Sequence, residues 1–418
     1  MPPRRTHTKS RSGCSNCKRR KVKCDEAYPT CFNCKRQDVP CSLSGTIIDP
    51  PDTNRLASHS LQPNILPPTP SSSDENDFTP PSDHASAAMA TVAEQIAPFP
   101  PHELWSNDFE LMHHYCTVTA EALSTQREMR HVWRVVMPKE GYRYPFVMHG
   151  ILAISATHKA YLLPNGRKKY LAMSDYHQTV GSEGFRSALQ NVCPETTVPI
   201  FCFASIVIFF VFALPIRSEG GRLEAPIQNW LELGTLIRGI KTNLSPLLPG
   251  VLRSEFAPIV YGVWPIEGVG PVDNIPSLEN SLLPLDTWDA IGRLRDFYKT
   301  DLPSTSLEHY LKLVDKLEEN AKLIARAGPY VECGAVIAWI YGIHDSIIMD
   351  IAAYRPHALL ILAYYSLFLS TLERNHWYTK GWSKQLIEDI EVHLIGQTKF
   401  LELFQWPKQK LAESHHWL

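Results

Sequence analysis

The stretch CSNCKRRKVKCDEAYPTCFNCKRQDVPC, residues 14–41, holds six of the ten cysteines of a 418-residue chain. Its spacing is C-x2-C-x6-C-x6-C-x2-C-x6-C, and its halves, CSNCKRRKVKC and CFNCKRQDVPC, repeat one pattern seventeen residues apart. A C-x2-C pair that opens a helix can present two thiolates to one metal ion, and the third cysteine returns after the helix. The repeat therefore predicts two equivalent metal-binding halves.

The cysteines also indicate which metal and how many ions. Thiolates in a tetrahedral arrangement favour zinc, an ion without redox chemistry. Six cysteines cannot supply two independent four-cysteine sites, so two zinc ions must share two thiolates. A disulfide framework is the alternative. It is disfavoured because MPPRRTHTKSRSGC, at the N-terminus, is not followed by the apolar segment of a secretory signal, and an intracellular chain keeps its thiols reduced or metal-bound.

This spacing resembles the fungal binuclear zinc cluster family, the DNA-binding module of regulators of the galactose-regulator type. The match covers about residues 9–43, and Pro29 stands where the family usually has a proline. The resemblance implies two Zn²⁺ ions as cofactors. It implies two bridging ligands and one further pair for each ion: Cys14 and Cys31 as bridges, Cys17 and Cys24 for one ion, Cys34 and Cys41 for the other.

Positive charge is concentrated at the same end of the chain. Residues 1–41 contain eleven Lys and Arg against three Asp and Glu, a balance of +8, which leaves −10 for the remainder of a chain with net charge −2. This polarity predicts a polyanion-binding end on an acidic body. The first half of the repeat carries five cations, Lys18, Arg19, Arg20, Lys21 and Lys23, whereas the second has Lys35 and Arg36 followed by Asp38.

The first helix is therefore expected to face the DNA. Its cations are taken to lie at a helix N-terminus, against the helix dipole, so that only a binding role accounts for them. In the family, a lysine of this helix reads guanine in a CGG triplet through the major groove. By position that residue is Lys21, with Arg20 as a second base-contacting candidate, and the other cations bind phosphate.

The basic N-terminal arm has three open interpretations. Arg4, Arg5, Lys9 and Arg11 could contact the DNA backbone, act as a nuclear import signal, or form a basic terminus without a specific role. Localisation in the nucleus follows from the predicted DNA-binding role.

A linker is predicted over residues 44–100. Residues 42–100 contain ten prolines, many Ser and Thr, and seven acids against one Arg, so they cannot bury enough apolar surface to offset the entropy of ordering. The linker is expected to be disordered. It contains no sustained heptad, which leaves a monomer and a homodimer both open.

Residues 101–418 predict an all-α regulatory domain. Apolar residues recur at helical spacing in the segments 104–123, 145–162, 170–189, 200–214, 227–242 and 305–326, and in several from Ala335 onward. Thr305 and Glu308 form a capping-box signature. No alternation of apolar and polar residues demands a sheet.

Two uncharged apolar runs, around 196–216 and 358–372, favour buried core helices over membrane spans. Prolines interrupt the first, and both apolar runs fall short of the ~20 residues that a bilayer requires. The four cysteines outside the cluster lie in apolar surroundings and are interpreted as buried small hydrophobes: Cys116, Cys193, Cys202 and Cys333.

Catalytic motifs are not found in this domain, and the chain is predicted not to be an enzyme. The pairs His113-His114 and His344-Asp345 favour surface or core positions over catalysis. The domain resembles the regulatory domain of the fungal sterol-uptake-control type of zinc-cluster regulators, on the segments 145–162, 229–242, 354–369 and 377–394 and the pair Trp406-Pro407. In sterol-responsive members this domain is a helical dimer that holds a sterol in an apolar pocket and keeps the protein from the nucleus until release.

That resemblance implies a pocket that helices such as 200–214 could line, although ordinary core packing explains the same residues. No ligand-binding residue is assigned. The sequence thus predicts a transcription factor that recognises CGG-containing DNA, regulates RNA polymerase II transcription and recruits the transcription machinery through its linker or acidic body. The alternatives are the same factor as a sterol- or lipid-responsive sensor, a pathway-specific regulator of a biosynthetic gene cluster, and an enzyme that carries a zinc cluster.

Overall fold

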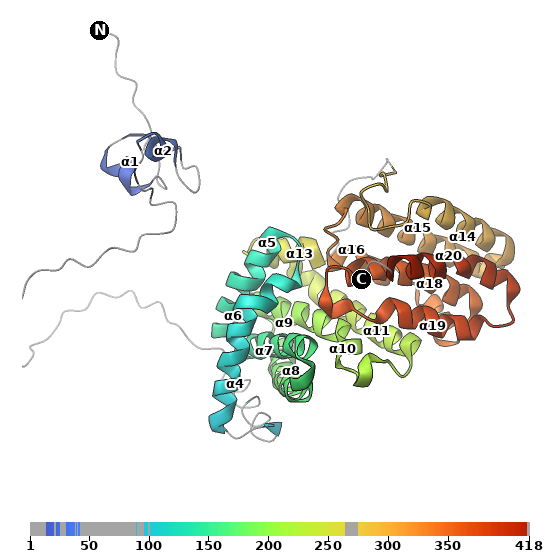
Figure 1. The fold of residues 1–418 in the computed structure, drawn as a ribbon, viewed down its shortest axis with the longest axis horizontal. Helices are drawn as coiled ribbons and strands as arrows, with labels where there is room; N and C mark the ends of the chain where they lie inside the picture. Colours follow the sequence, from blue (N-terminus) through green and yellow to red (C-terminus); the bar gives the residue numbers. More distant parts are fainter. Residues whose placement is uncertain are drawn as a thin grey trace, which may run out of the picture. The chain divides into compact units, whose positions relative to one another are not determined.

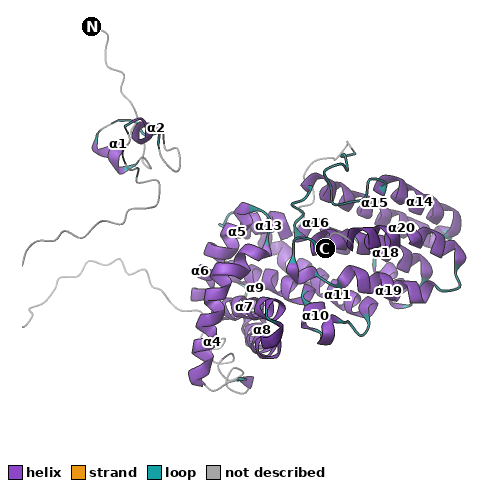
Figure 2. Cartoon of the chain, viewed as in Figure 1, coloured by secondary structure: helices purple, strands orange, loops and turns teal. Residues whose placement is uncertain are grey.

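The computed structural model describes residues 14–20, 22–25, 31–37, 39, 41, 89, 96–98, 101–263 and 275–415. The chain divides into two compact units, Met1–Asp77 and Phe78–Leu418. Helices are the only regular secondary structure among the described residues, as Figure 2 shows. The predicted fold class is therefore confirmed for a cysteine-rich module followed by an all-α part. Most of the predicted linker lies outside the described residues.

The first unit contains two short helices, α1 (Ser15–Arg19) and α2 (Phe32–Arg36). The second unit begins with α4 (Pro101–His114), the π-helix η1 (Tyr115–Thr119), the 3₁₀-helix η2 (Ala120–Leu123), α5 (Arg127–His131), the π-helix η3 (Val132–Val136), α6 (Met137–Arg143), α7 (Pro145–Leu162), η4 (Pro164–Gly166), α8 (Arg167–Gln190), α9 (Pro194–Phe212), α10 (Leu214–Arg217) and η5 (Glu219–Gly221). It continues with α11 (Pro226–Leu244), η6 (Ser245–Leu247), α12 (Leu248–Val251), α13 (Ala257–Val263), α14 (Thr287–Asp301), α15 (Ser304–Ala327), α16 (Cys333–Tyr341), α17 (Asp345–Ala352), α18 (Pro356–Glu373), η7 (Trp377–Thr379), α19 (Trp382–Leu394) and α20 (Thr398–His415).

Two helices that are apolar on all sides form the centre of the second unit. Most residues of α9 and α18 are buried, as expected for helices without a polar face. Figure 1 shows α4 to α8 grouped at one end of this unit and α14 to α20 at the other. Helix α11 lies between the groups and contacts both α9 and α19. The unit therefore has one main core that joins both groups, and a smaller apolar cluster lies between α4, α7 and α8.

The two apolar runs are core helices, as predicted. α9 is long and apolar enough by itself to cross a bilayer, but 67% of its apolar window is buried inside the unit. The helix begins at Pro194 and passes through Pro199, whereas the sequence predicted a start after that proline. Pro199 cannot donate to the carbonyl of Glu195, and the Tyr144 hydroxyl donates to that carbonyl instead, at 3.0 Å.

One residue of the predicted linker lies in the core of the second unit. Met89 is 5% exposed and packs over α8 and α7. A Cβ at Gly184 would lie 2.3 Å from the Met89 sulfur and 2.8 Å from Phe146 Cβ. The absent side chain at Gly184 thus creates the notch that Met89 fills.

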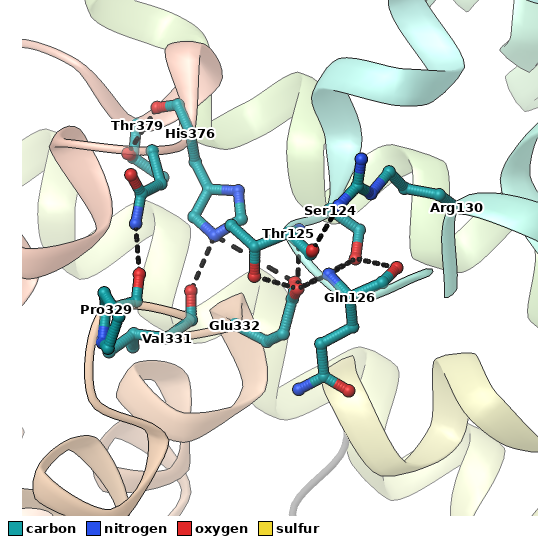
Figure 3. Close-up of polar contacts among 10 residues, drawn as sticks. Ser124, Thr125, Gln126, Arg130, Pro329, Val331, Glu332, His376 and Thr379 are labelled. Carbon is teal, nitrogen blue, oxygen red and sulfur yellow. Dashed lines mark hydrogen bonds and ion pairs between the residues drawn. The ribbon is translucent and has the colours of Figure 1, made fainter. Parts of the chain in front are cut away.

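A buried carboxylate ties the two ends of this unit together (Figure 3). Glu332 precedes α16, is 5% exposed, and accepts hydrogen bonds through one oxygen from four donors of the turn between η2 and α5. The donors are Ser124 Oγ at 2.8 Å, Thr125 N at 2.7 Å, Thr125 Oγ1 at 2.6 Å and Gln126 N at 3.0 Å. His376 lies 4.0 Å from the other oxygen, and burial lowers its pKa. The turn therefore encloses an anion that comes from more than 200 residues away.

Two local predictions are wrong. α15 begins at Ser304, which follows Pro303, so Thr305 is already inside the helix and no capping box forms with Glu308, which pairs with Lys312 instead. Of the four cysteines outside the cluster, Cys202 and Cys333 are buried, but Cys116 and Cys193 are only half-buried. The helices α5, η3, α6, α12, α13 and α14 fall in none of the predicted segments, and the π-helical form of η1, inside the predicted segment 104–123, was not predicted.

Replacement of Glu332 by Ala should destabilise the helical unit. Four donors would lose a buried charged acceptor, and each unsatisfied group costs about 1–3 kcal/mol, so we expect a loss of at least about 3 kcal/mol. Urea unfolding followed by circular dichroism measures it. Glu388→Ala, which removes an exposed glutamate 3.8 Å from Lys384, is the control and should cost less than about 1 kcal/mol. Equal costs for the two variants would contradict this role of Glu332.

Candidate metal centre and nucleic-acid interface

The two halves of the cysteine repeat fold in the same way. Cys14 and Cys31 are the N-caps of α1 and α2, and each thiol accepts a hydrogen bond from the backbone N–H three residues on. The distances are 3.3 Å from Cys17 N to Cys14 Sγ and 3.4 Å from Cys34 N to Cys31 Sγ. A sulfur thus replaces the oxygen that usually caps a helix.

The third cysteine of each half returns to the start of its own helix. The backbone N–H of Cys14 donates to Cys24 Sγ at 3.4 Å, and the N–H of Cys31 donates to Cys41 Sγ at 3.5 Å. All six thiols are at most 3% exposed and form a cluster of their own. The structure therefore brings together every cysteine that the sequence predicted as a ligand.

The spacing of the sulfurs fits zinc. All six cysteines are free thiols. Cys14 Sγ lies 3.7 Å from Cys31 Sγ and 3.6 Å from Cys34 Sγ, and Cys17 Sγ lies 3.7 Å from Cys31 Sγ. A regular tetrahedron with Zn–S bonds of about 2.3 Å has S···S edges of about 3.8 Å. The observed separations match these edges.

Two groups of four thiols could each hold one ion, and they share two members. In each group the sulfurs lie within 4.8 Å of one another. The shared cysteines are Cys14 and Cys31, and the groups are Cys14, Cys17, Cys24 and Cys31, and Cys14, Cys31, Cys34 and Cys41. Six ligands thus provide two four-coordinate positions.

The crowded thiols resist ionisation without a cation. Burial, with hydrogen bonds from neighbouring thiols, raises the pKa of Cys17, and raises that of Cys34 to about 12. Burial also raises the pKa of Cys14, but the Cys17 N–H and the neighbouring thiols outweigh it and lower the pKa to about 6. One thiolate is therefore stabilised at the expense of its neighbours, and divalent cations would favour ionisation of Cys17 and Cys34 as well.

Polar side chains outside the cluster support this geometry, and the sequence did not single them out. The carboxylate of Asp25 accepts from Phe32 N at 3.0 and 3.1 Å, at the start of α2. Asn33 Nδ2 donates to the Lys23 carbonyl at 2.9 Å. This bond links the second half of the repeat to the backbone of the residue before Cys24. The C-x-N-C pattern was the available signal for Asn33.

Four of the five predicted DNA-contacting cations lie on the surface of the first half. Lys18, Arg19, Arg20 and Lys23 are exposed, and Lys21 lies outside the described residues. The expectation that these cations oppose the helix dipole is wrong, since Lys18 and Arg19 occupy the last turn of α1, where the dipole favours them.

The arginines of this surface contact neutral partners. Arg19 Nη2 donates to Asn16 Oδ1 at 2.7 Å. Arg20 Nη1 donates to Gln37 Oε1 in the second half of the repeat. Neither contact cancels the positive charge that a polyanion would meet.

The described residues of the helical unit do not form a site of comparable definition. One cavity of about 580 Å³ lies between the segment 282–286 and the ends of α18 and α20, and another of about 420 Å³ lies between α5, η3 and α13. Neither is lined by α9, whose side chains over 200–212 belong mainly to the core. For this helix the structure shows ordinary core packing, which was the alternative to a ligand pocket.

The histidine pairs have structural contacts. His344 caps α17 by accepting from Ser346 N at 3.2 Å, and Asp345 pairs with Arg238 at 2.7 Å. His114 lies against His158, and burial lowers its pKa to about 4. These contacts fit the non-catalytic interpretation of both pairs.

Comparison with known proteins agrees with this geometry. Residues 12–47 match the fungal Zn(2)-Cys(6) binuclear cluster domain. A Zn(2)-C6 fungal-type transcription factor of Gibberella zeae is 22% identical over 97% of this chain and 86% of its own length. The Zn(2)-C6 fungal-type transcription factor afumD of Aspergillus fumigatus is 22% identical over 86% of this chain and 84% of its own.

A third similarity covers part of the chain. Sterol uptake control protein 2 of Saccharomyces cerevisiae is 53% identical over 161 residues, which are 37% of this chain and 16% of that protein. The cysteine geometry, the exposed cations and the similar proteins thus all indicate the same kind of domain. Residues 12–47 belong to the fungal Zn(2)-Cys(6) binuclear cluster domain family, and the chain as a whole is similar to Zn(2)-C6 fungal-type transcription factors.

Proposed function

We propose that this chain is a sequence-specific, zinc-dependent DNA-binding protein that regulates RNA polymerase II transcription from CGG-containing sites. The observation that carries the proposal is the pair of four-thiol groups that share Cys14 and Cys31, next to the exposed cations of α1. The relatives are named as transcription factors, which supports regulation over catalysis.

Each cysteine has a proposed role. Cys14 and Cys31 bridge both zinc ions, Cys17 and Cys24 complete one site, and Cys34 and Cys41 the other, in line with the two groups of thiols. Zinc supplies the charge that lets all six thiols ionise, and the bonds to it hold both helices in place. The backbone N–H groups that donate to the sulfurs stabilise the thiolates.

The proposed DNA contacts fall into two classes. Lys21 reads guanine in the major groove, with Arg20 as a second base contact, and Lys18, Arg19 and Lys23 bind phosphate. Exposure of four of these five cations on one half of the module supports contact with DNA. Action on DNA requires the chain to reach the nucleus. The acidic segment before the helical unit is proposed to contact the transcription machinery.

A second candidate function is control by a sterol or another apolar ligand bound to the helical unit, which would act as a homodimer. The similarity to sterol uptake control protein 2 of Saccharomyces cerevisiae and of Candida albicans favours it. Under this proposal, ergosterol or cholesterol should raise the melting temperature of the full chain, because a ligand that binds only the folded state stabilises it by mass action. No shift with either sterol, at concentrations at which both stay dissolved, would count against this function.

Zinc content and DNA binding should fail together when a bridging cysteine is removed. We expect the wild-type chain to hold two zinc ions, and Cys31→Ser to lose both zinc and DNA binding, because the metal bonds contribute the folding free energy of the module. Metal analysis and a mobility-shift assay measure the two properties. Cys193→Ser, at a half-buried cysteine of the helical unit, is the control and should retain both. Wild-type DNA binding that survives a chelator would contradict the proposal.

Loss of Lys21 should relax sequence preference. Lys21→Ala in the full chain should weaken binding to a CGG duplex by about 1–3 kcal/mol and reduce the preference over a duplex with the triplet scrambled. Lys35→Ala, at an exposed cation of α2, is the control and should change both affinities by the same factor, if at all. Fluorescence anisotropy over a salt series separates base from phosphate contacts. A uniform loss for Lys21→Ala would show that this lysine binds phosphate only.

A further inference from the structure

Besides the shared cysteines, a surface contact between the two halves of the zinc module joins two equivalent positions. Arg20 and Gln37 stand three residues after the second cysteine of their respective halves, and each is the C-cap of its helix. Since the two halves fold alike, Arg20 of the first half faces Gln37, the equivalent residue of the second half. The repeat puts an arginine in the first half and a neutral amide in the second.

The Arg20–Gln37 hydrogen bond lies on the surface. Arg20 Nη1 donates to Gln37 Oε1, and both side chains are exposed. The contact therefore adds little to the stability of the module, which rests on the buried thiols. Its effect is on the guanidinium, a group with many rotamers that the contact holds in one orientation.

The remaining donors of Arg20 stay available. In the described part of the chain, the Arg20 side chain makes no hydrogen bond or ion pair besides the one to Gln37. Nε and Nη2, on the edge of the guanidinium away from Nη1, are thus left for another acceptor. Two adjacent N–H groups of arginine match O6 and N7 of guanine, the commonest specific contact in the major groove.

Gln37 is also suited to orient Arg20 because its side chain is neutral. An amide oxygen orients the guanidinium without neutralising it, whereas a carboxylate would lower the positive charge that DNA of any sequence meets. Ordering the arginine before binding lowers the entropy lost on binding. We propose that Gln37 is a positioning residue for DNA reading, which sets the orientation in which Arg20 meets a guanine. This inference rests on the proposed function.

The test is a double-mutant cycle in the full chain, measured on a CGG duplex and on a duplex with the triplet scrambled. Gln37→Ala should weaken CGG binding about three- to tenfold and leave the scrambled duplex unchanged, as expected for lost pre-organisation. Arg20→Ala should weaken CGG binding at least as much. The double variant should bind like Arg20→Ala alone, since Gln37 acts through Arg20.

Two further variants distinguish positioning from other roles. Gln37→Glu keeps an acceptor oxygen, so it should retain the CGG preference while its negative charge weakens binding to both duplexes. Arg36→Ala removes an exposed cation beside Gln37 and should weaken binding to both duplexes by the same factor. Zinc content and the melting temperature should be the same in all of these variants.

Each contrary result has a defined meaning. Additive effects of Arg20→Ala and Gln37→Ala, an equal loss on both duplexes for Gln37→Ala, or lower zinc content in that variant would overturn the positioning role. A wild-type chain without zinc-dependent preference for CGG would overturn the proposed function itself. That failure is visible before any variant is measured.

Discussion

Apart from its cysteines, the described part of the cysteine-rich module has no apolar core, and this constraint determines its structure. Its buried residues in the described part are the six cysteines, while Val22, Phe32 and Val39 are 42%, 62% and 37% exposed. A segment of this length cannot bury enough apolar surface to offset the entropy of ordering. Bonds from thiolates to metal replace that burial. The helix caps, the return of the third cysteines and the surface on which the cations stand all follow from where the sulfurs must be.

The helical unit solves the same problem by burial. Helices α9 and α18 are apolar on every side, and they are contacted by surrounding helices that include α7 and α11 for α9, and α16, α19 and α20 for α18. Two of its polar groups are well partnered: the Glu195 carbonyl freed by Pro199 accepts from the Tyr144 hydroxyl, and Glu332 accepts from four donors. The two units thus obtain their order from different physical sources.

This difference explains which features of the two units could be predicted from the sequence. Metal ligation dictates cysteine spacing, so the number of ions and the pairing of halves could be predicted from the repeat. The contact of Arg20 with Gln37 could not, because it depends on how two short helices face each other. In the helical unit, apolar periodicity predicted α7 with both of its ends, and it predicted α8, α11 and α15 with ends that differ from the observed ones by one to three residues. The capping box at Thr305 failed because Pro303 fixes an earlier start, and Glu332 carried no local signal for partners about 207 residues away.

Met89 has a consequence for where the helical unit can be separated from the module. The notch over Gly184 is filled by a residue that precedes α4 by 12 positions. A truncated chain that starts at α4 would leave Phe146 and the α8 backbone facing water, and exposed apolar surface of this kind promotes aggregation. The boundary of the folded unit therefore lies before Met89, inside the segment whose composition predicts a linker. A truncated chain for crystallisation, or a helical unit transferred to another regulator, should begin there.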